Sequence, residues 1–234
     1  LEIVKLRAAR ARLLGFADHA SFVTADQTAK NPQNVADMLE RLAPIAARNA
    51  RREQLELERV SPDESVESWD WALLTERVRR ERFAVDTAAM RPYFEAERVY
   101  HDGIFTAASR LYGLSFAERS DLVGYHPDVR IFEVFDEDGS PRGLFLLDLY
   151  TRDSKRGGAW MNSLIAQNRL LDHPTVVVNN LNVPKPAQGE PTLLSYDEVV
   201  TAFHEFGHAI HAMLQNVTYP DLAGTPRDFV EFPS

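Results

Sequence analysis

The segment from Ser195 to Gln215 constrains the fold more than any other part of this 234-residue chain. Ser195 can cap the first turn of a helix, and Glu198 stands where it completes a capping box. Apolar residues then recur at the spacing of one helix face, at Val199, Phe203, Phe206, Ile210 and Met213. The pattern predicts a buried helix, on which polar side chains need a particular reason to be present.

That helix carries the pattern His204-Glu205-Phe206-Gly207-His208. Residues four apart lie on one helix face, so His204 and His208 can bind one zinc ion through their ring nitrogens. Glu205 is rotated from them by about 100°, which suits a general base acting on a zinc-bound water. The alternative is a chance pattern on a packing helix, which would bury titratable groups at a cost and without a function.

A catalytic zinc site needs a third protein ligand and leaves its fourth position to water. Thr225 is a good helix N-cap, Pro226 suits the first helical position and Asp228 the third, so we expect a second helix to begin there. Glu231 would lie in the second turn of that helix and could reach the metal. Spacing alone leaves open the alternative that Glu231 is a solvated carboxylate.

The rest of the chain predicts a mainly α fold: a helical lobe with a small β-sheet beside the motif helix. Apolar periodicity and capping residues indicate helices, packed through their apolar stripes, over 3–14, 31–60, 69–83 and 91–112. Alternation and an Asp138-Gly139 turn indicate strands over 129–135, 143–150 and 173–179. We expect a helical part over 1–120, and a part over 121–234 that holds the sheet, the motif helix and the third-ligand helix.

Composition narrows the class of protein. The formal net charge of -9 argues against nucleic-acid binding and does not suggest an anionic membrane surface. No run of eighteen apolar residues offers a membrane span. Cysteine is absent, which excludes a disulfide framework and fits a cytoplasmic protein. The chain begins at Leu1 and stops at Ser234 directly after a motif, so we expect it to be a piece of a longer protein.

The motif helix, together with Asp228-Phe229-Val230-Glu231-Phe232-Pro233-Ser234, resembles the thimet oligopeptidase (M3) family of zinc peptidases. The resemblance covers nearly the whole chain and includes residues 125–130, 155–161 and 197–199. The sequence of residues 226–232 resembles that of the bacterial peptidyl-dipeptidase branch. Members of this branch remove dipeptides from the free C-terminus of short peptides. The resemblance implies one Zn²⁺ held by His204, His208 and Glu231, with Glu205 as the base.

The chain departs from the family pattern in two places. Thr225 meets Pro226 directly, where members carry a short insertion, and the family's transition-state tyrosines and substrate-binding histidine lie downstream of Ser234. Three functions therefore stay open: release of C-terminal dipeptides, cleavage of internal bonds by an oligopeptidase, and an inactive truncated lobe that binds zinc and peptide.

Two further features are open to a packing or a functional interpretation. His211 shares the metal face of the motif helix, and we expect it to pack or to support the ligands rather than to bind the metal. Residues 155–161 combine a basic turn, two glycines and Trp160. They form either a loop beside a strand or a wall of the substrate channel, with backbone groups open to pair with a peptide.

Overall fold

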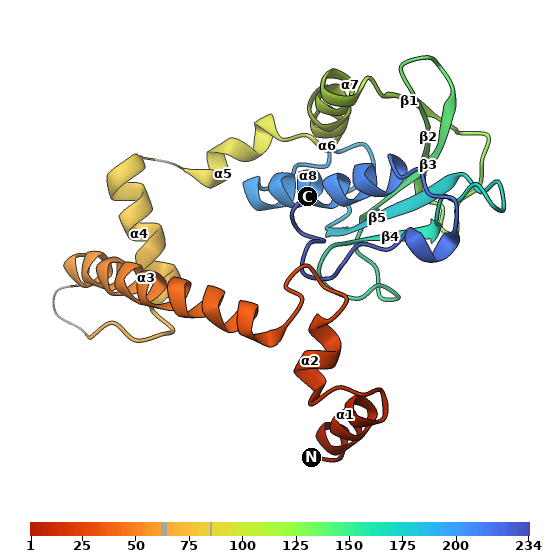
Figure 1. Cartoon of the computed structure of the whole chain (residues 1–234). Helices are drawn as coiled ribbons and strands as arrows, with labels where there is room; N and C mark the ends of the chain where they lie inside the picture. Colours follow the sequence, from red (N-terminus) through yellow and green to blue (C-terminus); the bar gives the residue numbers. More distant parts are fainter. Residues whose placement is uncertain (62–64, 85) are drawn as a thin grey trace. The chain divides into compact units, whose positions relative to one another are not determined.

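The computed structural model describes residues 1–61, 65–84 and 86–234. The chain divides into two compact units: unit 1 is Leu1–Asp86 with Pro226–Asp228, and unit 2 is Thr87–Thr225 with Phe229–Ser234. Figure 1 draws the helices of unit 1 in red to yellow and the sheet of unit 2 in green to cyan. The division into 1–120 and 121–234 that the sequence suggests remains a prediction about domain organisation.

Unit 1 is built of helices whose ends follow the capping residues of the sequence. α1 (Glu2–Leu13) ends just before Gly15, which has a φ of 83°. α3 (Pro32–Arg59) begins after Asn31, whose side chain accepts a hydrogen bond from the backbone N–H of Asn34 at 2.9 Å. α2 is His19–Thr24 and α4 is Trp71–Phe83. The helices expected over 3–14, 31–60 and 69–83 are confirmed.

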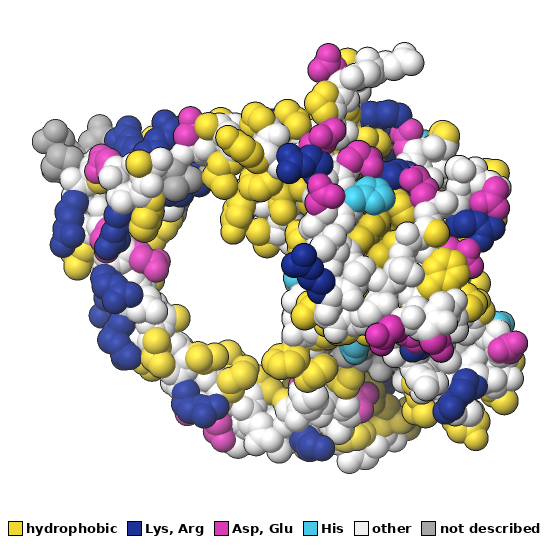
Figure 2. Space-filling view, turned by 90° about the horizontal axis from the view of Figure 1, so that it is seen from above, with side chains coloured by type: hydrophobic (Ala, Val, Ile, Leu, Met, Phe, Trp, Pro, Cys, Tyr) yellow, Lys and Arg dark blue, Asp and Glu magenta, His cyan; other side chains and the backbone are white. Residues whose placement is uncertain are grey.

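Helix α3 exposes the apolar stripe that the sequence assigns to the core. Met38, Leu39, Leu42 and Ile45 are between 42% and 54% exposed, and Figure 2 shows hydrophobic side chains in yellow at the molecular surface. The prediction of core packing is wrong here, because periodicity shows which side of a helix is apolar but not whether another element covers it. Neither α3 nor any other helix in the described ranges has the length and apolar composition to cross a bilayer.

The helix predicted over 91–112 is interrupted in the structure. The segment runs through α5 (Thr87–Met90), a 3₁₀ turn η1 (Arg91–Tyr93), α6 (Ala96–Arg98), a π-helix η2 (Val99–Phe105) and α7 (Thr106–Tyr112). Glu95 breaks the helix, because it forms a β-bridge with Leu193 instead of a helical turn. Gly113 ends α7 with a φ of 72°, a left-handed conformation that glycine adopts easily.

The centre of unit 2 is a 5-stranded sheet in the order β1-β2-β3-β5-β4. Its strands are β1 (Ser115–Glu118), β2 (Arg130–Phe135), β3 (Pro141–Tyr150), β4 (Trp160–Ile165) and β5 (Thr175–Val183). β2 and β3 form an antiparallel hairpin, β3 and β5 run parallel, and β4 pairs antiparallel with β5. β4 is therefore an edge strand of the sheet.

The chain is thus mixed α and β, and the prediction of a mainly helical fold with a small sheet is too narrow. The strands expected over 129–135, 143–150 and 173–179 are confirmed as β2, β3 and β5. β1 and β4 were not predicted. β1 is 4 residues long, and the last four residues of β4 are all exposed, so neither strand shows the alternation by which a strand is identified.

Helix α8 (Tyr196–Met213) lies against the sheet and closes the core of unit 2 (Figure 1). Phe105 is at the centre of an aromatic cluster, stacked on Phe116 at a centroid distance of 4.3 Å and in contact with Phe206 of α8 at 5.8 Å. Ala202 and Ala209 of α8 are fully buried, which lets the helix approach the strands closely. Burial of this apolar face fixes which residues of α8 point away from the sheet.

Candidate metal centre

The predicted capping box starts helix α8. The Ser195 hydroxyl accepts a hydrogen bond from the backbone N–H of Glu198 at 3.2 Å, and the Glu198 carboxylate accepts one from the backbone N–H of Ser195 at 2.6 Å. Both interactions satisfy backbone donors that a helix start leaves without a partner. The sequence prediction of this helix and its cap is confirmed, but Phe203, which the prediction placed on the buried face, is 41% exposed.

Replacing Ser195 by alanine is expected to lower the free energy of unfolding by about 1 kcal/mol, because the cap hydrogen bond is lost. Urea unfolding followed by circular dichroism measures this change. Ser163, an exposed serine of β4, supplies the control: Ser163→Ala should change the unfolding free energy by less than about 0.5 kcal/mol. Equal stability of Ser195→Ala and the wild-type chain would contradict the role of the cap.

His204 and His208 lie one turn apart on α8. Their ring centroids are 4.8 Å apart with an interplanar angle of 84°. The His204 side chain is 42% exposed and that of His208 is 12% exposed, so this face of the helix borders on solvent. The side-by-side placement predicted from the spacing of four is present.

Glu231 brings a carboxylate to both histidines. Its Oε2 lies 3.2 Å from His204 Nε2 and 3.2 Å from His208 Nε2. One ligand atom from each of the three residues lies within 4.8 Å of the others. Ligands of a tetrahedral ion bound at 2.0–2.1 Å are about 3.3 Å apart, and the two distances from Glu231 to the histidines are close to that value.

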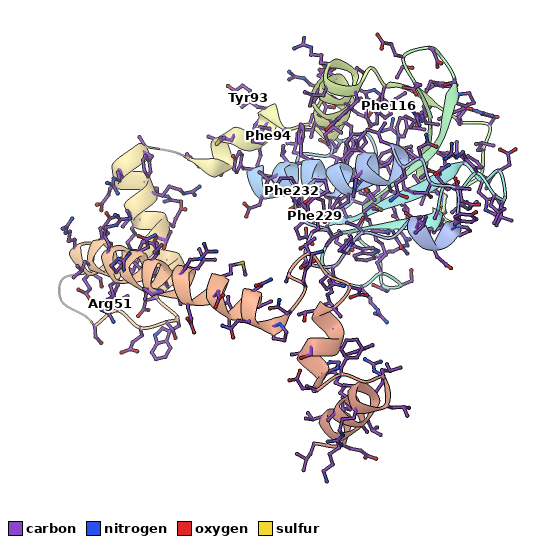
Figure 3. The ribbon with its side chains drawn as sticks, viewed as in Figure 1. Arg51, Tyr93, Phe94, Phe116, Phe229 and Phe232 are labelled. Carbon is purple, nitrogen blue, oxygen red and sulfur yellow. The ribbon has the colours of Figure 1, made fainter. Side chains whose placement is uncertain are left out.

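The segment that carries Glu231 is not the helix predicted from Thr225 and Pro226. Residues 227–231 lie in turns. A helix beginning at Pro226 would meet Pro233 within about two turns, and so short a helix is marginal in water. Pro233 also disfavours a helical conformation at Phe232. Phe229 and Phe232, which flank Glu231 in the sequence, pack with their ring centroids 5.2 Å apart (Figure 3).

Asp228 has a different role from the helical position predicted for it. Its carboxylate accepts hydrogen bonds from the backbone N–H and hydroxyl of Thr28, at 3.1 and 2.7 Å, and from the backbone N–H of Ala29 at 2.9 Å. These bonds lie within unit 1. They hold the pKa of Asp228 below its usual value, the interaction with Thr28 being the largest cause.

Glu205 follows His204 on α8 and is buried, near enough to His204, His208 and Glu231 for their charges to affect its pKa. The residue is 7% exposed, and burial raises the pKa of its carboxyl, against the lowering effect of His204 and His208. The buried hydroxyl of Tyr100 lies close enough for the Glu205 charge to raise its pKa, after the larger effect of burial. A buried carboxyl beside a metal-type cluster is the arrangement expected of a proton acceptor.

The segment 155–161 contributes a buried lysine and the start of the edge strand. The Lys155 side chain is 4% exposed and its Nζ lies 3.2 Å from a carboxylate oxygen of Asp148, which is fully buried. Arg152 donates to both Asp148 oxygens at 2.7 Å, and the Tyr125 hydroxyl donates at 2.7 Å. The role of Asp148 could not be predicted from the sequence, because a single acidic residue in a strand has no recognisable pattern.

The geometry defines a protein with a His-His-carboxylate metal-type cluster and an acid beside it. The whole chain, residues 1–234, matches the model of peptidase family M3. The chain therefore belongs to peptidase family M3, as the motif resemblance predicted.

The chain is also similar to curated peptidases. The chain is 44% identical over 238 residues to the dipeptidyl carboxypeptidase of Salmonella typhimurium, which covers 99% of the chain and 35% of the relative. It is 38% identical over 243 residues to oligopeptidase A of Escherichia coli, covering 100% of the chain and 36% of the relative. The thimet-like oligopeptidase of Dictyostelium discoideum is 32% identical over 254 residues, covering 100% and 37%. The chain thus spans about a third of the length of these relatives.

Proposed function

We propose that this chain carries the catalytic metal centre of a zinc peptidase that acts on short peptides. His204, His208 and Glu231 hold one Zn²⁺, and Glu205 is the general base. The observation that carries the proposal is the convergence of the three ligand atoms within 4.8 Å, beside a buried carboxyl on the same helix. Membership of a peptidase family supports the reaction class.

The proposed ligands and the proposed base have different roles in peptide hydrolysis. The imidazoles of His204 and His208 would bind the ion through ring nitrogens, and the Glu231 carboxylate would bind it through an oxygen. Zn²⁺ held by these residues would supply Lewis acidity and would lower the pKa of a bound water to about 7. The Glu205 carboxylate accepts the proton of the attacking water and passes it to the leaving amine.

We further propose that edge strand β4 and the segment 155–161 form a wall of the peptide-binding channel. β4 pairs with β5 on one side, and an edge strand offers backbone N–H and C=O groups to an extended peptide. The strand lies against α8, and the backbone of Met161 lies close enough to the Glu205 carboxylate to lower its pKa. A peptide paired with β4 would therefore pass beside the metal ligands.

The proposed reaction is the release of dipeptides from a free C-terminus, in line with the 44% identity to a dipeptidyl carboxypeptidase. The 38% identity to oligopeptidase A supports the alternative of cleavage at internal bonds. A zinc-binding lobe without turnover is the third possibility, since the chain spans 35% of the first of these relatives.

A pair of peptides distinguishes these functions. The zinc-loaded chain is incubated with a short peptide that has a free C-terminus and with the same peptide amidated at that end, and the products are identified by mass spectrometry. We expect dipeptides from the free peptide and none from the amidated one. Internal cleavage of both indicates an oligopeptidase. Bound zinc with no product from either indicates the binding lobe, and the chelated protein gives the background rate.

A further inference from the structure

Gly207 lies between the metal-binding histidines in the sequence, at the place where the chain after Glu231 crosses helix α8. A Cβ added at Gly207 would lie 2.7 Å from the Cα of Ser234, 3.0 Å from its carbonyl carbon and 3.3 Å from the carbonyl oxygen of Pro233. Contacts under about 3 Å do not occur for real Cβ atoms, so any side chain here would require backbone to move. The absence of a side chain lets the segment lie directly on the helix.

The kind of atom contacted distinguishes Gly207 from another helical glycine of unit 2. At Gly103 an added Cβ would meet the tip of the Phe203 ring at 3.3 Å, and Phe203 is 41% exposed and can rotate away. At Gly207 an added Cβ would instead meet backbone atoms of Pro233 and Ser234, which cannot rotate away as a side chain can. Alanine is the best helix former and glycine among the worst, so α8 alone would favour alanine at this position.

The crossing segment, Pro233 and Ser234, is hydrogen-bonded directly to the backbone of Glu231, the proposed third ligand. The Ser234 hydroxyl donates a hydrogen bond to the carbonyl oxygen of Glu231 at 2.9 Å, so a displacement of Ser234 is passed to the backbone of Glu231. The Glu231 carboxylate must stay near both histidines, from which it is now 3.2 Å away. Metal–ligand distances tolerate only about 0.2 Å of error.

We propose that Gly207 is a positioning residue for the third metal ligand: it admits the Pro233–Ser234 backbone to the surface of α8 and thereby holds Glu231 over His204 and His208. This inference rests on the proposed metal site. A side chain at position 207 would leave the two histidines in place on the helix and separate Glu231 from them.

The test is the zinc affinity of the 234-residue chain, measured by competition with a chromophoric chelator. Gly207→Ala is expected to weaken zinc binding by about 10–100-fold, the usual effect of losing a group that orients a ligand. Gly224→Ala is the matched control, because a Cβ there meets nothing within 4 Å and the backbone has an ordinary φ. Its zinc affinity should equal that of the wild-type chain. Equal affinities for Gly207→Ala and the control would overturn the proposal.

Deleting Pro233 and Ser234 tests how Gly207→Ala acts. The substitution acts either through a steric clash with this segment or through a general weakening of helix α8. In the shortened chain the alanine has no backbone to meet, so Gly207→Ala should no longer change zinc affinity relative to the shortened parent. An equal loss of affinity, or loss of the folded helix by circular dichroism, in both backgrounds would show that the effect arises within α8 and would refute the proposal.

A readout without metal keeps this inference separate from the proposed function. Hydrogen exchange of residues 229–234 is followed in the metal-free chain, where Gly207→Ala should raise the exchange rate and Gly224→Ala should not. If the wild-type chain binds no zinc, the proposed function fails, while this exchange comparison still decides whether Gly207 holds the segment. Unchanged exchange in Gly207→Ala would contradict the positioning role.

Discussion

Replacing Glu205 by glutamine is expected to slow peptide hydrolysis by about 10²–10⁴-fold while zinc stays bound, because general-base catalysis contributes a factor of that size. The amide has nearly the same shape and can still hydrogen-bond a water, but it cannot take its proton. Glu205 is buried and the metal-type cluster consists of His204, His208 and Glu231, so the substitution removes no ligand. Turnover and bound zinc are measured on the same sample.

The matched control for this change is Asp197→Asn. Asp197 is an exposed acid in the first turn of the same helix, so its substitution also replaces a carboxylate of α8 by an amide. We expect the Asp197 variant to keep its rate within a few-fold of the wild-type chain. Loss of zinc from Glu205→Gln would place Glu205 among the ligands, and a rate within a few-fold of wild type would remove it from the mechanism.

Local signals in the sequence were sufficient to predict helix α8 and the pair of histidines. The capping box involves residues three apart, and His204 and His208 are four apart, so both follow from the geometry of one helix. The placement of Glu231 beside the histidines was predicted from a second helix that the structure does not contain. Its carboxylate does lie beside both histidines, but it does so from a turn, because the approach of its segment depends on contacts with α8 and not on local helix propensity.

Features that depend on distant contacts were not predictable in the same way. The exposed stripe of α3 has the same periodicity as a buried one, and only the presence of a covering element distinguishes them. The edge strand β4 has hydrogen-bonding partners on one side and a mostly exposed set of side chains, so no alternation marks it. The buried ion cluster around Asp148 joins residues from separate loops and strands, and no spacing rule connects them.

That cluster gives the largest stability effect that we expect in unit 2. Asp148→Asn should lower the free energy of unfolding by about 3–5 kcal/mol, the usual result of removing one partner of a buried ion pair. The Asp148 side chain is fully buried and that of Lys155 is 4% exposed. Burial lowers the pKa of Lys155, and the Asp148 carboxylate opposes that shift. In Asp148→Asn, the ammonium loses its charged partner and keeps neutral ones, the backbone carbonyl oxygens of residue 148, Tyr150 and Leu181.

A surface pair on the same hairpin supplies the control. The carboxylate of Asp136 pairs with Arg142, and both side chains are partly exposed, at 26% and 32%, so Asp136→Asn should cost less than about 1 kcal/mol. The double variant Asp148→Asn, Lys155→Met should recover much of the loss, because it removes the unpaired charge as well. If the double variant is no more stable than Asp148→Asn, the effect comes from packing and not from the charge.

Acid unfolding tests the same interaction in the unmodified chain. Burial alone would raise the pKa of Asp148, but hydrogen bonds from Arg152, Tyr125 and Lys155 outweigh it, and the pKa is lowered. A carboxyl with a lowered pKa in the folded state contributes stability above its unfolded pKa of about 3.9 and loses it as the pH falls through the folded value. The wild-type chain should therefore lose stability below about pH 4 more steeply than Asp148→Asn does. Parallel curves of unfolding free energy against pH for the two proteins would show that Asp148 is not charged in the fold, since only a charged carboxylate can lose stability by taking up a proton.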